Sequence, residues 1–225
     1  MRKIRSDFSR AIGRLTTRFR TSSRSQRATF TAIARTNAWG SAESVSGPGS
    51  TQARGADFRE ELITLLDSWK FQSIVDAPCG DFNWMRHVLA GRDLVYTGID
   101  IVEELITGNV REHSSPNRRF LCLDLTRDLL PPADVVICRD GLVHLSLVDA
   151  QAAVRNFQRS GSSYLLTSTF INRSKNSDIP TGGWRALNLE AAPFCFPEPL
   201  ALIDERCTHS DGIYRDKRLG LWKLS

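Results

Sequence analysis

Acidic residues stand at the C-terminal ends of four successive apolar runs, where a parallel sheet binds its ligands. They are Asp76, Asp100, Asp124 and Asp140, and His144 follows the last of them by four residues. An acid about 20 residues beyond the first strand–helix turn suits the two hydroxyls of a ribose. Asp100 has this spacing, although Asp100 or Asp124 taken alone could equally be a helix cap or a turn acid. Together the acids predict a nucleoside-binding edge.

The turn after the first run, "DAPCGDFNW", differs from a pyrophosphate-binding turn. A dinucleotide site needs G-x-G-x-x-G, whose glycines let the pyrophosphate approach a helix N-terminus. This turn has Gly80 alone and adds Asp81, a carboxylate that would repel a pyrophosphate and attract a cationic ammonium group. The turn therefore argues against a nicotinamide dinucleotide and for S-adenosylmethionine. We interpret Cys79 as a small loop residue and not as a nucleophile.

The elements that must position these residues alternate along the chain. Residues 57–69 have apolar side chains at helical spacing, with Asp57 as the expected N-cap. Five buried-type strands are expected within 71–77, 94–100, 119–125, 133–140 and 163–170, with helical stretches between them. Residues 200–207 and 218–225 flank an Asp-Gly turn and predict a hairpin. The fold class is α/β: a doubly wound, mostly parallel seven-stranded sheet with a C-terminal antiparallel hairpin.

From Phe71 to Ser225 the chain resembles the class I S-adenosylmethionine-dependent methyltransferases, which have a Rossmann-like fold. The resemblance rests on four motifs in register with the hairpin: "VDAPCGDFNWM", "YTGIDIVEELI", "FLCLDLT" and "ADVVICRDGLVHLS". The chain is also similar to bacterial methyltransferase-domain proteins that carry an "NxWGSxESxSGxGS" segment before the first helix and a "TGGWRALNLEAAPFCFPEP"-like segment before the hairpin. These segments are residues 37–50 and 181–199.

The resemblance implies how the first turn would hold the methionine end of S-adenosylmethionine. The backbone around Ala77, Cys79 and Gly80 would contact it, with Asp76 and Asp81 nearby.

The resemblance also implies four contacts to the nucleoside end. Asp100 would accept the ribose hydroxyls, and Ile101 would pack on the adenine. Asp124 would accept the adenine amino group, and the Leu125 N–H would donate to the ring.

The fourth strand end supplies the residues expected to carry the reaction. Methyl transfer to oxygen or nitrogen needs an aligned nucleophile and often a base, and Asp140 with His144 can supply this beside Arg139. His144 titrates near neutrality and is the first choice as base, with capping of the following helix as the structural alternative. The N-P-P-[YF] motif of base-amino methylation is absent there, since "CRDG" stands instead. Methylation of nucleic-acid bases is therefore disfavoured.

Two irregular segments are candidates for substrate binding. The long stretch before the hairpin carries Asn172, Trp184, Arg185 and Asn188, which suit a polar acceptor such as a sugar unless the stretch is an ordinary surface loop. Residues 37–56 are rich in Gly and Ser and could be a linker or a lid. Trp39 and Glu43 are unusual in a spacer and are therefore further candidates.

The positive charge is concentrated at the N-terminus. The net charge is +5, but the first 27 residues carry nine Lys/Arg and one acid, which leaves −3 for the remainder. Within residues 1–36 we expect a basic, partly disordered or amphipathic tail. It could be solvated, contact an anionic membrane surface or RNA, or target an organelle. Residues 57–225 form the expected catalytic domain.

The sequence thus predicts a methyltransferase that uses S-adenosylmethionine and no metal. We expect it in the cytoplasm, either free or peripheral to a membrane. Five scattered cysteines without a C-x-x-C pair fit a reducing compartment. The leading hypothesis is O-methylation of a small polar or glycan-like acceptor. The alternatives are an RNA methyltransferase recruited by the tail and a non-catalytic cofactor-binding partner protein.

Overall fold

In the computed structural model, which describes residues 22–207 and 212–224, seven strands form one mixed sheet. They run in the order β3-β2-β1-β4-β5-β7-β6. The first five are parallel, and β7 is antiparallel to both β5 and β6. The strands are β1 (Ser73–Asp76), β2 (Val95–Asp100), β3 (Arg118–Cys122), β4 (Val135–Cys138), β5 (Tyr164–Phe170), β6 (Ala201–Asp204) and β7 (Lys217–Lys223). The predicted strands and hairpin are confirmed.

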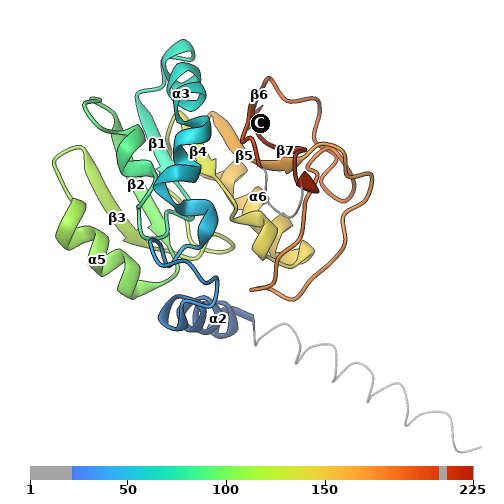
Figure 1. Ribbon diagram of the computed structural model, residues 1–225, viewed down its shortest axis with the longest axis horizontal. Coiled ribbons are helices and arrows are strands. Elements are labelled where there is room, and N and C mark those ends of the chain that lie inside the picture. Colours follow the sequence, from blue (N-terminus) through green and yellow to red (C-terminus); the bar gives the residue numbers. More distant parts are fainter. Residues whose placement is uncertain (1–21, 208–211, 225) are drawn as a thin grey trace, which may run out of the picture.

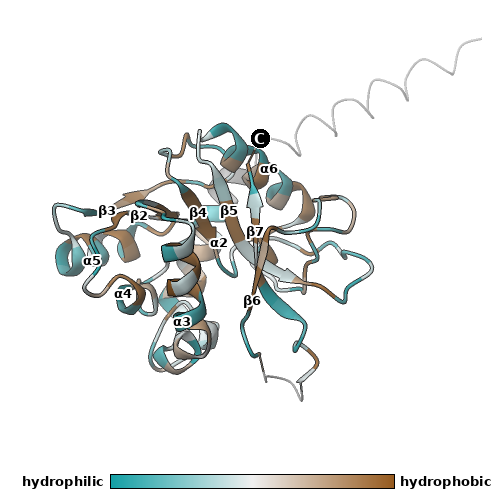
Figure 2. Cartoon of the chain, turned by 90° about the horizontal axis from the view of Figure 1, so that it is seen from above, coloured by the Kyte–Doolittle hydropathy of each residue, from teal (hydrophilic) through white to brown (hydrophobic). Residues whose placement is uncertain are grey.

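Helices cover both faces of the sheet because its strands are apolar on both sides. The helices are α2 (Ser22–Thr36), α3 (Gln52–Ser68), α4 (Met85–Val88), α5 (Glu103–His113) and α6 (Leu147–Arg159). Ile74 packs with α3 and α4 on one face, whereas its neighbour Val75 packs with α6 on the other. Figure 2 shows the central strands as largely hydrophobic and the outer surfaces of α5 and α6 as more hydrophilic.

The helix predicted from residue 57 begins earlier, at Gln52. Thr51 is its N-cap, and the Thr51 hydroxyl accepts a hydrogen bond from the Arg54 N–H at 3.5 Å. The expected cap Asp57 therefore lies inside the helix. The apolar pattern could not show this start, because residues 52–56 are Gln, Ala, Arg, Gly and Ala and include no large apolar side chain.

The N-terminal part of the described chain crosses the carboxyl ends of the parallel strands. Figure 1 shows α2 at this edge, where a continuous segment leads from it to α3. Residues 22–36 of the expected tail thus form a helix against the sheet domain. Residues 1–21 of the expected basic, amphipathic tail lie outside the described residues. Within the described ranges, no helix is both long and apolar enough to cross a membrane.

Candidate active site

A pocket lies at the carboxyl ends of β1, β2 and β4, where the strand order reverses. Its walls come from α2, the 39–50 segment, the turns after β1, β2 and β3, and the loop after β4. The pocket brings together many residues singled out in the sequence: Trp39, Cys79, Gly80, Asp100, Ile101, Asp124, Leu125, Arg139, Asp140 and His144. This is the position at which open α/β sheets bind ligands.

Asp100 is fixed at the end of β2 by backbone donors. Its Oδ2 accepts from the Gly80 N–H at 3.1 Å, and its Oδ1 accepts from the Val102 N–H at 2.9 Å. The residue is 6% exposed, and burial raises the pKa of its carboxyl to about 6 despite these hydrogen bonds. Asp100 lines the pocket, and a carboxylate has more acceptor positions than these two bonds use, so it can also accept from hydroxyl groups.

Asp124 stands at the neighbouring strand end in a tight turn. Its Oδ1 accepts from the N–H of Thr126 at 2.8 Å and from the Thr126 hydroxyl at 2.6 Å. The turn orients the carboxylate beside Ile101 and Leu125 on the pocket wall. The three residues together offer an apolar surface with an acceptor at its rim, which fits a purine carrying an amino group.

Asp76, Ala77 and Asp81 from the first motif do not line the pocket. Asp76 lies beneath the turn, where its Oδ2 accepts from the Tyr96 hydroxyl at 2.7 Å. Burial raises the pKa of Asp76 to about 7. Ala77 is fully buried in the core. Asp76 and Ala77 therefore support the turn from below.

The Asp81 carboxylate contacts the 39–50 segment. It accepts from the hydroxyls of Ser44 and Ser46 at 3.0 and 3.1 Å and from the Val45 N–H at 3.0 Å. Gly80 is correspondingly constrained: its φ is +55°, and a Cβ there would lie 2.1 Å from the Ser46 Oγ. The extra acid of this turn thus fastens the segment onto the pocket, a role that composition alone could not reveal.

The same segment reaches the reaction end of the pocket through Trp39. The Trp39 ring lies 4.7 Å from the His144 ring, with 30° between their planes. Glu43 points elsewhere: its Oε1 accepts from the Gln52 N–H at 2.6 Å and from the Asn83 Nδ2 at 2.7 Å, and it does not line the pocket. Glu43 therefore ties the segment to the start of α3.

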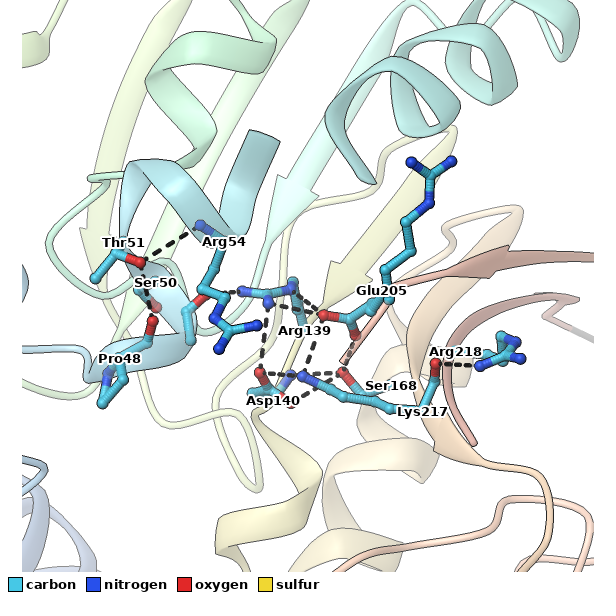
Figure 3. A network of polar contacts seen from close by, with 12 residues as sticks. Pro48, Ser50, Thr51, Arg54, Arg139, Asp140, Ser168, Glu205, Lys217 and Arg218 are labelled. Carbon is cyan, nitrogen blue, oxygen red and sulfur yellow. Dashed lines mark hydrogen bonds and ion pairs between the residues drawn. The ribbon is translucent and has the colours of Figure 1, made fainter. Parts of the chain in front are cut away.

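Four charged residues meet beside the loop after β4 (Figure 3). Lys217 lies 2.7 Å from the Asp140 Oδ2 and 3.1 Å from the Glu205 Oε2. The Arg139 Nε and Nη2 donate to the Glu205 Oε2 at 2.8 and 2.7 Å, and the Arg139 Nη1 donates to the Gly49 carbonyl at 2.9 Å. We name Arg139, Asp140, Glu205 and Lys217 the charge cluster. Its two cations balance its two carboxylates.

The charge cluster sets the ionisation of Asp140 and the position of Arg139. Burial would raise the pKa of Asp140, but Lys217 and Arg139 together hold it well below its usual value. The Arg139 guanidinium also lies over the Phe58 ring at 4.6 Å, and all three of its nitrogens have partners. Arg139 therefore binds both Gly49 and Glu205 at the edge of the pocket that it lines.

Glu205 and Lys217 were missed in the sequence because they belong to the hairpin. Their position could have indicated them. Each stands at the end of a strand that packs into the core, where a charged side chain needs a partner of opposite charge.

His144 is held in one tautomer by the loop before the hairpin. Its Nδ1 lies 2.7 Å from the Gly183 carbonyl oxygen, which can only accept, so Nδ1 carries the proton. The Nε2 lone pair is then available to take a proton. Burial lowers the pKa of His144 below 6.5, so the ring is neutral at pH 7. Ser146, not His144, caps α6 through the Asp149 N–H.

The other predicted residues of the long loop do not line the pocket. The Asn188 Nδ2 donates to the Arg173 carbonyl at 2.8 Å, and the Asn172 N–H donates to Asp216. Trp184 packs edge-on against Tyr214. The Arg185 Nη1 donates to the Leu142 and Val143 carbonyls at 3.2 and 3.0 Å. These contacts shape the loop, and the loop in turn orients His144.

The comparisons with known proteins support the fold. No protein-family model matches the chain, and no curated protein matches it. Human N-acetylserotonin methyltransferase in complex with SAM is similar over 76% of this chain, with 12% identity and a TM-score of 0.55. The methyltransferase domain of bacterial CtHen1-CN is similar over 74% of this chain and 97% of its own, with 15% identity and a TM-score of 0.53. The chain spans about half (51%) of the human enzyme's length. The predicted Rossmann-like methyltransferase fold is confirmed, whereas the narrower first-motif subgroup remains a prediction.

Proposed function

We propose that the protein is an S-adenosylmethionine-dependent methyltransferase that acts on an oxygen atom of a small acceptor. The observation that carries the proposal is the pairing, in one pocket, of the Asp100 carboxylate with a His144 ring whose Nδ1 is bound to the Gly183 carbonyl, which leaves Nε2 as the basic nitrogen. The first residue suits a ribose and the second suits a hydroxyl nucleophile. The fold is one that methyltransferases use.

The residues around Asp100 fit S-adenosylmethionine. When bound, this cofactor supplies an electrophilic methyl group on a sulfonium. Asp100 would hold the ribose hydroxyls, Ile101 would pack on the adenine, and Asp124 with the Leu125 N–H would bind the adenine edge. Cys79 and Gly80 line the pocket where the methionine end would lie.

His144 would serve as the general base. Its Nε2 would take the proton of the acceptor hydroxyl when that oxygen receives the methyl group and the cofactor leaves as S-adenosylhomocysteine, and the Gly183 carbonyl would stabilise the resulting positive charge through Nδ1–H. Such a base contributes typically 10²–10⁴-fold to a rate. An amine that is already unprotonated attacks without a base, whereas a hydroxyl gains nucleophilicity as its proton is withdrawn, so a neutral base in the pocket suits oxygen.

The acceptor would be a small hydroxylated molecule, with a sugar as one candidate. Trp39 offers a flat apolar face beside His144, and Asp140 offers a carboxylate oxygen on the same wall. Arg139 and Lys217 would position Asp140 rather than contact the acceptor.

The test is calorimetric binding of S-adenosylhomocysteine, followed by a screen of hydroxylated acceptors for methyl transfer. We expect wild-type protein to bind and Asp100→Ala to bind about 100-fold more weakly, since a charged hydrogen-bonding group is lost. Asp93→Ala removes an exposed acid outside the pocket and serves as the control. A wild-type protein that binds neither S-adenosylhomocysteine nor S-adenosylmethionine would refute the proposal.

A further inference from the structure

One wall of the pocket is made by α2, which contributes a stripe of three residues at helical spacing. Gln26, Phe30 and Ala34 lie on the face of α2 that lines the pocket. Gln26 is the polar member of the stripe. It is 3% exposed, and its Nε2 has no hydrogen-bond partner among the described residues. A buried amide donor without a partner is rare, and this one faces a pocket that a ligand atom could enter.

Contacts on either side of the stripe fix the rotation of α2. On one side, the Arg27 Nη1 donates to the Ile101 carbonyl at 2.7 Å and lies 2.9 Å from the Cys122 Sγ. On the other side, a Cβ on Gly182 would come within 2.5 Å of the Thr29 Cγ2, so the loop before the hairpin packs closely on the helix. With both sides held, the residues between them must face the pocket.

The same contacts indicate which part of the pocket Gln26 lies near. Its neighbour Arg27 binds at the ends of β2 and β3, the strand ends that carry Asp100 and Asp124. Gln26 directly precedes Arg27 and lines the same pocket as Asp100 and Asp124, and we therefore consider it against the nucleoside.

We propose that the Gln26 amide of α2 donates a hydrogen bond to a ring nitrogen of the cofactor's adenine. This inference rests on the proposed function. The adenine amino group is a donor and is matched by the Asp124 carboxylate, whereas unprotonated ring nitrogens are acceptors and match an N–H donor. Helix α2 is then part of the cofactor site.

The experiment measures binding of S-adenosylhomocysteine to Gln26→Met, which keeps the side-chain length but has no N–H. We expect the affinity to fall about tenfold, the value of one buried hydrogen bond to a ligand. We also expect the unfolding midpoint of the ligand-free variant to rise, because the unpartnered donor is removed. A residue with a merely structural role would show the opposite change in stability. Gln158→Met, at an exposed glutamine of α6, is the matched control.

A second arm uses the 1-deaza, 3-deaza and 7-deaza analogues of S-adenosylhomocysteine. Wild-type protein should lose about tenfold in affinity for one analogue, and Gln26→Met should bind that analogue and the parent compound equally. Unchanged binding of the parent by Gln26→Met, or the same discrimination in both proteins, would overturn the inference. Failure of wild-type protein to bind the parent would instead refute the proposed function.

Discussion

The two ends of the pocket each hold an aspartate at the end of a parallel strand, but their surroundings act on these carboxyls in opposite directions. At the nucleoside end, Asp100 has backbone N–H partners, and burial raises its pKa to about 6. At the reaction end, Lys217 and Arg139 outweigh burial and hold the pKa of Asp140 below its usual value. A neutral backbone therefore leaves Asp100 sensitive to mild acid, whereas the charge cluster keeps Asp140 ionised.

The largest expected effect is on His144, the base at the reaction end. In His144→Ala we expect turnover to fall 10²–10⁴-fold, the usual contribution of a general base, with unchanged affinity for S-adenosylhomocysteine. The acidic limb of the wild-type rate profile should lie below pH 6.5, because burial lowers the pKa of His144. His87→Ala, in α4 and outside the pocket, is the control. Wild-type turnover in His144→Ala would remove His144 as the base.

The next effect is on the stability of the charge cluster. Lys217→Met leaves Asp140 and Glu205 to share Arg139, so we expect the free energy of unfolding at pH 7 to fall by about 3–5 kcal/mol. Urea denaturation measures this change. Adding Glu205→Gln to Lys217→Met restores the balance of charge and should recover part of the loss. Lys223→Met, at an exposed position of β7, should have little effect. An equal loss in the single and double variants would show that packing, not charge, is the cause.

Lys217 also illustrates how far the sequence alone could be read. Strand order and the acids at the strand ends follow from local patterns, because apolar runs alternate with helices and the carboxyl ends of parallel strands meet at one edge. Lys217 lies 77 positions after Asp140, and Glu205 lies 66 positions after Arg139, and no local pattern links such distant positions. The same limit applies to Gln26. It lies in an N-terminal segment whose basic composition predicts a tail, and that composition does not indicate a contact with the pocket.

The two irregular segments are a second example of contacts that the sequence alone could not predict. Composition made both residues 37–56 and the loop before the hairpin candidates for substrate contact. In the structure Trp39 lines the pocket, whereas Trp184 packs on Tyr214 and remains 42% exposed. Both tryptophans suit a stacking surface, and only their tertiary contacts separate them.

A third prediction concerns Asp76, beneath the nucleoside end. Since burial raises its pKa to about 7, the native state keeps a proton that the unfolded chain has released, and stability from this group is lost as the pH rises from about 4 to 7. Relative to wild type, Asp76→Asn should therefore become more stable by up to about 4 kcal/mol over this range. Urea denaturation at each pH tests this. Asp93→Asn, at an exposed position, should show no such trend.

The smallest expected effect is a pH dependence of cofactor affinity that only the nucleoside end of the pocket should cause. Ribose hydroxyls need the ionised Asp100 carboxylate, so the affinity for S-adenosylhomocysteine should fall about tenfold for each pH unit below 6. Calorimetry from about pH 4.5 to about pH 8 measures how the affinity changes with pH. Asp100→Asn should bind more weakly at all pH values and lose the slope, because its amide does not titrate. Lys217→Met should keep the slope, since Asp140 belongs to the other end. A slope that survives in Asp100→Asn would mean that another group controls cofactor binding, and the contrast between the two ends would then fail.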